Sequence, residues 1–264
     1  MTFMNKKCLT KNPLCNKSLA AIIILITLAV IFFVGVKKNN SVATNPSEAA
    51  IEKVITKWIA NNPEAIIDSV QNMQRKAMED QQKNAQKNIS VKKNELFNDK
   101  NSPQNISSGY DVTVVEFFDY SCGYCKRAAL TVEQLTAQDK KVRFVHKHFP
   151  ILGEASTQMA QTALAINIAQ PNLYAQFHKE MMKSQARGKS AAIDVAKKIG
   201  ANIALIEKTL NDKESEINSM IEENLKLGAS IGINGTPGFV IGEELIPGAI
   251  DLESFKAKIA EARK

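Results

Sequence analysis

Three consecutive segments near the middle of the chain constrain the fold more than any other feature. VTVVEFF (112–118) is an apolar, β-branched run with an aspartate at each end, as expected of a buried strand. A helical pattern follows from about residue 122, and VRFVHKHFP (142–150) then has the pattern of a second strand. Two strands joined through a helix with short links predict a parallel β-α-β unit, because parallel neighbours need a crossover connection.

The chain beyond residue 150 extends this unit. Residues 154–230 have a helical pattern throughout, punctuated at Pro171, Gly188 and Gly200. INGTPGFVIGEELIPG predicts two short strands around a Gly-Glu turn, and DLESFKAKIAEARK predicts an amphipathic last helix capped by Asp251. The expected order is β-α-β, a helical insertion over about residues 154–230, and β-β-α. The sequence therefore predicts an α/β fold class.

Residues 1–43 have the character of a targeting segment. Lysines among the first 47 residues account for six of the seven charges in the formal net charge of +7, and no acid precedes Glu48. This placement argues against a nucleic-acid-binding face. LAAIIILITLAVIFFVGV (19–36) is uncharged, and its length lies between a secretory core and a spanning helix. A signal peptide cleaved after Ala43 and an uncleaved N-terminal membrane anchor both stay open, and both export the rest of the chain.

The cysteines fall into two groups. Cys8 and Cys15 precede the apolar run, so the exported part holds only Cys122 and Cys125. A disulfide between residues this close in sequence closes almost no loop and would stabilise the fold little. Because exported proteins that use disulfides as structural links usually carry several, this lone pair predicts redox chemistry.

The position of the pair at the start of a helix explains how it could react. Unpaired backbone N–H groups and the helix dipole favour the thiolate of Cys122 and lower its pKa. Cys125 lies one turn further along the same face and is expected to be more buried. Cys122 is therefore expected to attack a disulfide, and Cys125 to resolve the mixed disulfide. Gly123 would let another chain approach closely, and Tyr124 would offer a contact at the rim.

A metal clip is the competing interpretation of the cysteine pair. Zinc would need two further ligands, and the chain holds only three histidines: His146, His148 and His178. His146 and His148 share one face of a strand, but their spacing is unusual for zinc, and there is no second CxxC. We therefore expect no metal, no cofactor and structural roles for the histidines. A non-enzymatic surface protein with a metal-binding or vestigial CxxC stays as an alternative.

Glu116 is a charged residue inside the otherwise apolar first strand, six residues before Cys122. Strand alternation places it on one face with Phe118, which favours burial, whereas the alternative is a strand-end carboxylate facing solvent. A buried carboxylate at this position could exchange a proton with Cys125 when that thiol attacks or leaves.

Thr236-Pro237 is the third candidate element of the site, flanked by Gly235 and Gly238 just ahead of a strand. A cis bond at Pro237 would leave the backbone of Thr236 free to bind an extended peptide as an added strand. On spacing alone a trans turn is the commoner outcome for such a bond.

These motifs resemble a known family. VEFFDYSCGYCK is similar to the active-site segment of the DsbA-type thioredoxin-fold disulfide oxidoreductases of the bacterial periplasm, and GTPGFVIG to their cis-proline loop. The resemblance covers roughly residues 107–264 and implies a thioredoxin fold with a helical insertion. It implies a nucleophilic Cys122, a resolving Cys125, Glu116 as the buried acid and a cis Pro237. Substrates would be exported proteins with cysteine thiols or disulfides, and a membrane redox partner would recycle the pair. The residues expected to contact substrate are Gly123, Tyr124, Thr236 and Pro237.

The dipeptide between the cysteines leaves the direction of electron flow open. Gly-Tyr departs from the Pro-His of typical DsbA oxidases and matches the dipeptide of DsbC-type isomerases. Disulfide formation and disulfide reshuffling by an oligomer therefore both stay as interpretations.

Residues 44–105 predict a helical extension ahead of a catalytic domain at residues 106–264. Pro63 is expected to begin a second helix after a break at Asn61-Asn62. The first helix carries an apolar stripe at helical spacing, formed by Ile51, Val54, Ile55, Trp58 and Ile59. The extension is similar to that of the ScsC/Com1-like branch, in which it builds oligomers. An exposed helical linker between the domain and the membrane is the alternative.

Overall fold

The computed structural model describes residues 47–105 and 109–264, so the predicted targeting segment, Cys8 and Cys15 lie outside the described residues. By its internal contacts the chain divides into two units, residues 1–70 and residues 71–264. Among the helices of the described residues, none combines the length and the apolar character that crossing a membrane requires.

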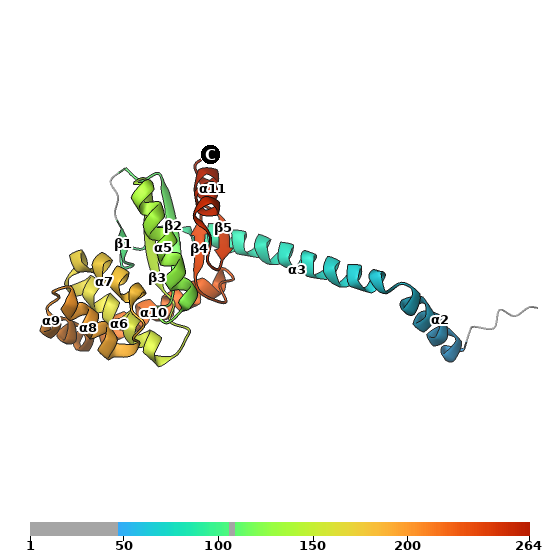
Figure 1. Cartoon of the computed structure of the whole chain (residues 1–264), viewed down its shortest axis with the longest axis horizontal. Coiled ribbons are helices and arrows are strands. Elements are labelled where there is room, and N and C mark those ends of the chain that lie inside the picture. The colour runs from blue at the N-terminus through green and yellow to red at the C-terminus, as the bar shows by residue number, and fades with distance from the viewer. Residues whose placement is uncertain (1–46, 106–108) are drawn as a thin grey trace, which may run out of the picture. The chain divides into compact units, whose positions relative to one another are not determined.

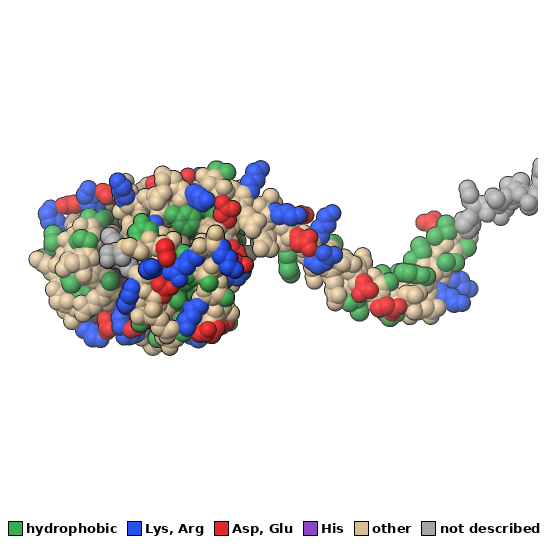
Figure 2. Space-filling view, turned by 90° about the horizontal axis from the view of Figure 1, so that it is seen from above, with side chains coloured by type: hydrophobic (Ala, Val, Ile, Leu, Met, Phe, Trp, Pro, Cys, Tyr) green, Lys and Arg blue, Asp and Glu red, His purple; other side chains and the backbone are tan. Residues whose placement is uncertain are grey.

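The first unit contains helix α2 (Glu48–Asn61) and the beginning of α3 (Pro63–Val91). The predicted break between the two helices is confirmed, and the side-chain amide of Asn62 donates to the carbonyl oxygen of Trp58 at 2.7 Å. No residue of α2 is buried, and Trp58 is 52% exposed. Figure 2 shows hydrophobic side chains lying on the surface of this helix.

The second unit is built on a five-stranded sheet in the order β1-β3-β2-β4-β5. The strands are β1 (Gln104–Asn105), β2 (Val112–Phe118), β3 (Val142–His148), β4 (Gly238–Ile241) and β5 (Glu244–Pro247). β2 and β3 are parallel, as predicted, and every other neighbouring pair is antiparallel. Helix α5 (Gly123–Gln138) connects β2 to β3, which makes the predicted β-α-β unit.

Strand alternation divides the core between the two faces of this sheet. On one face, β2, β3 and β4 pack against α5 and the last helix, α11 (Leu252–Ala262), whose N-terminus is capped by Asp251 as predicted. Val114 and Phe255 belong to this layer. On the other face, Val115 and Phe117 pack against α3, α4 (Lys93–Phe97) and α10 (Glu214–Ser230). Residues alternating along one strand therefore point into two different layers.

The helical insertion lies between β3 and β4 in sequence. Its helices are α6 (Glu154–Ala169), α7 (Pro171–Lys183), α8 (Gly188–Lys198), α9 (Ile203–Asp212) and α10 (Glu214–Ser230). α6 runs through the middle of this group and buries Met159, Ala163 and Ile166. Figure 1 shows the insertion as a helical group beside the sheet, in yellow and orange. The predicted order β-α-β, insertion, β-β-α is confirmed.

The segment before β2 contributes to the core of the second unit. Ile89 at the end of α3 and Leu96 of α4 are completely buried against the sheet. β1, which the turn-rich sequence NSPQNISSG did not indicate, pairs antiparallel with β3. The division of the chain at residues 105 and 106 stays a prediction, but side chains assigned to the extension clearly stabilise the domain beyond it.

Candidate active site

The first cysteine of the pair lies at the start of α5. Cys122 is the N-cap residue, with extended backbone, and its Sγ accepts a hydrogen bond from the backbone N–H of Cys125 at 3.4 Å. Its thiol donates to the carbonyl oxygen of Thr236 at 3.2 Å. Cys122 is 6% exposed, and both cysteines are free thiols. The cysteine pair at the start of α5 therefore lies against the loop that precedes β4.

The two thiols have opposite electrostatic environments. The hydrogen bond from the Cys125 side chain lowers the pKa of Cys122 to about 5, assisted by the backbone N–H groups of Cys125 and Tyr124 and opposed by burial. Burial raises the pKa of Cys125 well above that of a free thiol. One sulfur is therefore stable as a thiolate at neutral pH, while its neighbour holds its proton.

Asp119 fixes the turn that joins β2 to the first cysteine. Its backbone carbonyl accepts from the N–H of Cys122 at 3.0 Å, and its carboxylate accepts from the N–H of Ser121 at 2.7 Å. The other carboxylate oxygen accepts from the N–H of Leu152, just before the insertion, at 3.0 Å. The hydroxyl of Ser156 in α6 donates to that of Ser121 at 2.8 Å. From the sequence alone, Asp119 was expected only to mark the end of a strand.

The Thr236-Pro237 peptide bond is cis, as the family resemblance implied and against the commoner trans form that spacing alone favoured. The carbonyl oxygen of Pro237 accepts from the N–H of Gly248 at 2.8 Å, which ties this loop to the end of β5. The loop places Thr236 against Cys122.

The residues between the cysteines lie at the surface. Tyr124 is 61% exposed, and the guanidinium carbon of Arg127 lies 4.2 Å from the centre of its ring. Apart from Gly123 itself, its two chain neighbours and the adjacent backbone of α5, no heavy atom of the described residues lies within 4 Å of the position that a Cβ on Gly123 would take. Another chain can therefore approach the backbone at Gly123 without meeting a side chain there, as the sequence analysis expected.

Glu116 is buried, as strand alternation predicted, with 1% of its surface exposed. Its Oε2 lies 3.3 Å from Nδ1 of His146, its partner in the parallel register of β2 and β3. Proton exchange with Cys125 stays a prediction, because the neighbour that the structure gives to this carboxylate is a histidine.

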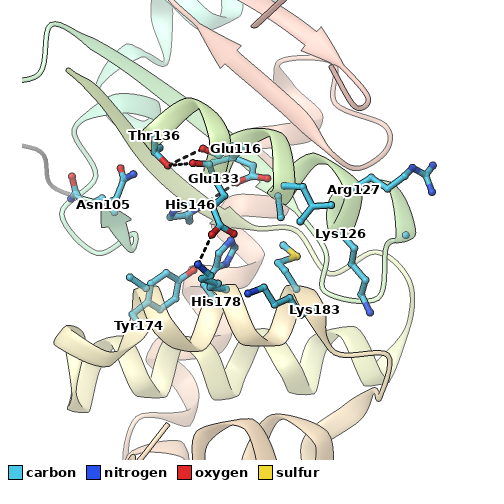
Figure 3. A pocket seen from close by; sticks show the side chains of 18 of the residues that line it. Asn105, Glu116, Lys126, Arg127, Glu133, Thr136, His146, Tyr174, His178 and Lys183 are labelled. Carbon is cyan, nitrogen blue, oxygen red and sulfur yellow. Dashed lines mark hydrogen bonds and ion pairs between the residues drawn. The ribbon is translucent and has the colours of Figure 1, made fainter. Parts of the chain in front are cut away.

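A pocket of about 640 Å³ lies between α5 and α7, and Glu116 lines it together with His146, His178 and Tyr174. Figure 3 shows Asn105 and Tyr174 toward one end of this pocket and Lys126, Arg127 and Lys183 toward the other. The histidines were expected to have structural roles only. Their convergence on Glu116 was missed because it depends on the parallel register and on how α7 folds back onto the sheet.

The fold and the site define a thioredoxin-fold protein-disulfide oxidoreductase with a helical insertion. The chain belongs to the DsbA-like family, because the model of the DSBA-like thioredoxin domain matches residues 113–260. The predicted family and fold are thereby confirmed.

Three solved structures illustrate the similarity. The thiol-disulfide exchange protein alpha-DsbA2 of Wolbachia pipientis is 30% identical, covering 67% of this chain and 95% of its own, with a TM-score of 0.63. A periplasmic thioredoxin-like protein of Salmonella enterica serovar Typhimurium is 30% identical, covering 66% and 96%, with a TM-score of 0.58. ScsC of Proteus mirabilis, in a transitional conformation, is 25% identical over 82% and 96%, with a TM-score of 0.56.

The curated relatives are much longer proteins. A region of the Na(+)/H(+) antiporter NhaA 1 of Salinispora arenicola is 22% identical to this chain over 152 residues, or 57% of the chain. The chain spans about a quarter of the length of the curated relatives it matches, 23% in both cases.

Proposed function

We propose that the protein forms or reshuffles disulfide bonds in exported proteins, with Cys122 as the nucleophile and Cys125 as the resolving thiol. The observation that carries this proposal is the asymmetry of the pair. Cys122 has a pKa lowered to about 5 and lies against the cis-proline loop, whereas burial raises the pKa of Cys125. A low-pKa thiolate beside a resolving thiol is the arrangement that thiol–disulfide exchange uses.

The proposed reaction begins with the Cys122–Cys125 disulfide. A substrate thiolate attacks Sγ of Cys122, the bond between the two enzyme sulfurs breaks, and Cys125 leaves and takes up a proton. A second substrate thiolate then attacks the substrate sulfur of the mixed disulfide, and Cys122 leaves as a thiolate. The substrate loses two electrons to the enzyme pair, and a membrane redox partner would remove them.

Glu116 is the proposed source of the proton for Cys125, through the buried side of α5. Gly123, Tyr124, Thr236 and Pro237 are the proposed substrate contacts. The exposed ring of Tyr124 and the open space at Gly123 support this assignment. The backbone of Thr236 would pair with an extended substrate strand, as in other cases of strand addition.

The lowered pKa of Cys122 favours disulfide formation over reshuffling, because a stable thiolate is a good leaving group from the mixed disulfide. The test measures the equilibrium of the pair with glutathione and the refolding of a scrambled-disulfide ribonuclease. A pair more oxidising than glutathione, with little refolding activity, would support disulfide formation. Efficient refolding that depends on an oligomer would instead support the isomerase alternative.

Self-association through residues 46–98 is the proposed role of the extension, with a second copy of this chain as the partner. It is supported by apolar side chains at helical spacing that are all exposed: Ile51, Val54, Ile55, Trp58 and Ile59. A deletion of the whole extension would be a poor test, because Ile89 and Leu96 are buried in the domain core. Substitutions within α2 test the association without removing those residues.

We place the protein in the periplasm, soluble after signal cleavage or tethered by residues 19–36. The lysine-rich start and apolar run of the sequence support export. Protease protection in spheroplasts, with the mass of the mature chain, distinguishes cleavage after Ala43 from a retained anchor.

The non-enzymatic alternative predicts a different thiol reactivity. A protein whose CxxC is vestigial would show no thiol that reacts rapidly with iodoacetamide at pH 5 to 6. The proposed function requires that Cys122 reacts there at a substantial rate, because most of it is thiolate above a pKa of about 5.

A further inference from the structure

Three potential metal ligands from three separate elements converge beside α5. Glu116 comes from β2, His146 from β3 and His178 from α7, and one ligand atom from each lies within 4.8 Å of the other two. Figure 3 shows the three side chains gathered in the pocket, which they line. The rings of His146 and His178 are 4.6 Å apart between centres.

Two of these three side chains are buried and have a polar atom that lacks a hydrogen-bond partner. Oε1 of Glu116 and Nδ1 of His146 have no hydrogen-bond partner, although these residues are only 1% and 7% exposed. Nδ1 of His146 lies 3.3 Å from Oε2 of Glu116 but does not form a hydrogen bond with it. Buried polar atoms nearly always have a bonding partner. A single partner that accepts lone pairs from both side chains would satisfy Glu116 and His146 together.

His178 is oriented as a metal ligand would be. Its Nδ1 lies 3.1 Å from the hydroxyl of Tyr120, which leaves Nε2 as the nitrogen available to the cluster. Metal-bound histidines usually hold their other ring nitrogen in such a hydrogen bond.

We propose that Glu116, His146 and His178 form a three-ligand site for a divalent transition-metal ion, with zinc as the best match. Two histidines and a carboxylate with an open fourth position are a common ligand set of zinc sites. Zinc bonds of about 2.0–2.1 Å at tetrahedral angles place neighbouring ligand atoms about 3.3 Å apart. Nδ1 of His146 and Oε2 of Glu116 are already 3.3 Å apart. The fourth position would face the pocket.

The site is separate from the cysteine pair. None of its three ligands is a thiol, and its fourth position opens between α5 and α7. While an ion is bound, the carboxylate of Glu116 is a ligand and cannot also deliver the proton proposed for Cys125. The metal site itself is independent of that role, and its test does not depend on thiol exchange.

The test uses the full chain with Cys122 and Cys125 oxidised to their disulfide and the remaining thiols capped with iodoacetamide. Cobalt(II) is titrated into this protein, followed by zinc chloride. We expect one equivalent of four-coordinate cobalt, with visible absorption but without a thiolate charge-transfer band, and its displacement by zinc. His178→Ala and His146→Ala should each weaken zinc binding at least about 100-fold, measured by competition with a chromophoric chelator.

The chain offers matched controls for both ligand types. His148→Asn removes the one histidine of the sequence that is not a proposed ligand, and Glu133→Gln removes another carboxylate that lines the pocket. Both should bind zinc within about threefold of the wild type, since neither residue is in the cluster. Loss of binding in the controls to the same extent as in the ligand variants would overturn the proposal, as would six-coordinate cobalt that the ligand variants retain.

A thermal measurement keeps the test decisive if a ligand variant folds poorly. Zinc should raise the Tm of the oxidised wild type and of His148→Asn, because an ion that binds only the folded state stabilises it. His178→Gln, which retains a polar side chain of similar size, should fold and show no such rise. A rise of equal size in His178→Gln would show that zinc binds elsewhere and that the proposal is wrong.

Discussion

Helices α2 and α6 have similar apolar content but very different surroundings. α6 lies among the other helices of the insertion and buries Met159, Ala163 and Ile166. α2 buries no residue at all, and the ring of Trp58 is half exposed. The contrast teaches that helical apolar spacing indicates a face that needs a partner, and does not say which chain supplies it. In the proposed function, the second unit carries the chemistry and α2 carries the association.

The largest expected effect is the loss of disulfide exchange when Cys122 of the second unit is replaced. Cys122→Ser should lower the rate of disulfide exchange with a model peptide at least about 1,000-fold, because it removes the sulfur that would form the mixed disulfide with the substrate. Its sedimentation velocity should match that of the wild type. As a matched variant, Cys125→Ser should accumulate a mixed disulfide that a non-reducing gel detects. Substantial exchange by Cys122→Ser would contradict the assignment of the nucleophile.

The next largest expected effect is a loss of self-association through α2 without a loss of disulfide exchange. Trp58→Glu with Ile55→Glu should raise the dissociation constant of the oligomer by about 100-fold or more, since each buried apolar side chain contributes about 1.5–3 kcal/mol. Light scattering after size-exclusion chromatography measures the change. Thr56→Glu, which adds a charge on α2 outside the apolar stripe, is the control and should leave the mass unchanged. A wild-type protein that is monomeric at all concentrations would rule out self-association.

A smaller effect is expected from packing in the second unit. A Cβ on Gly228 of α10 would lie 2.5 Å from Cε2 of Phe149, so Gly228→Ala should lower the free energy of unfolding by about 1–3 kcal/mol. Urea denaturation measures the change, and the mass of the protein in solution should not alter. Adding Phe149→Leu should recover part of the loss. An unchanged midpoint would mean that the ring moves aside at no cost.

The smallest effect is a shift along the pH axis. The alkylation rate of reduced protein should be half-maximal near pH 5 and fall about tenfold per pH unit below it, because only the thiolate reacts. The folded pKa of Cys122 lies below its unfolded value, so its thiolate stabilises the fold fully above pH 9. This contribution is lost as the pH falls through about 5. Unfolding of reduced wild type and Cys122→Ser at pH 4, 7 and 9 checks the sign of this stability contribution. An alkylation rate that is half-maximal near pH 8.5 would contradict the lowered pKa of Cys122.

The sequence predicted the features that depend on neighbours along the chain. The strand at residues 112–118, the helix start at Cys122 and the cap at Asp251 all follow from local pattern and are confirmed. The cis bond before Pro237 needed the family resemblance, because spacing alone favoured trans. Local pattern and family likeness together therefore located most of the candidate site.

What sequence reasoning missed depends on contacts between distant elements. β1 is too short and polar to show a strand pattern, and only its pairing with β3 defines it. The convergence of His146 and His178 on Glu116 needs the register of two strands and the packing of a third element. Likewise, Ile89 lies near the end of α3, and only the fold shows that it enters the core.

The carboxylate of Asp119 has a consequence for exchanging parts between relatives. Its two oxygens hold the turn before Cys122 and the backbone just ahead of the insertion, and Ser156 adds a second link to the same turn. A graft that replaces the insertion would therefore also replace part of the hydrogen-bond network that positions Cys122, the proposed nucleophile. Chimeras that retain the donors at Leu152 and Ser156 should preserve the reactivity of Cys122, whereas those that cut between them should alter it.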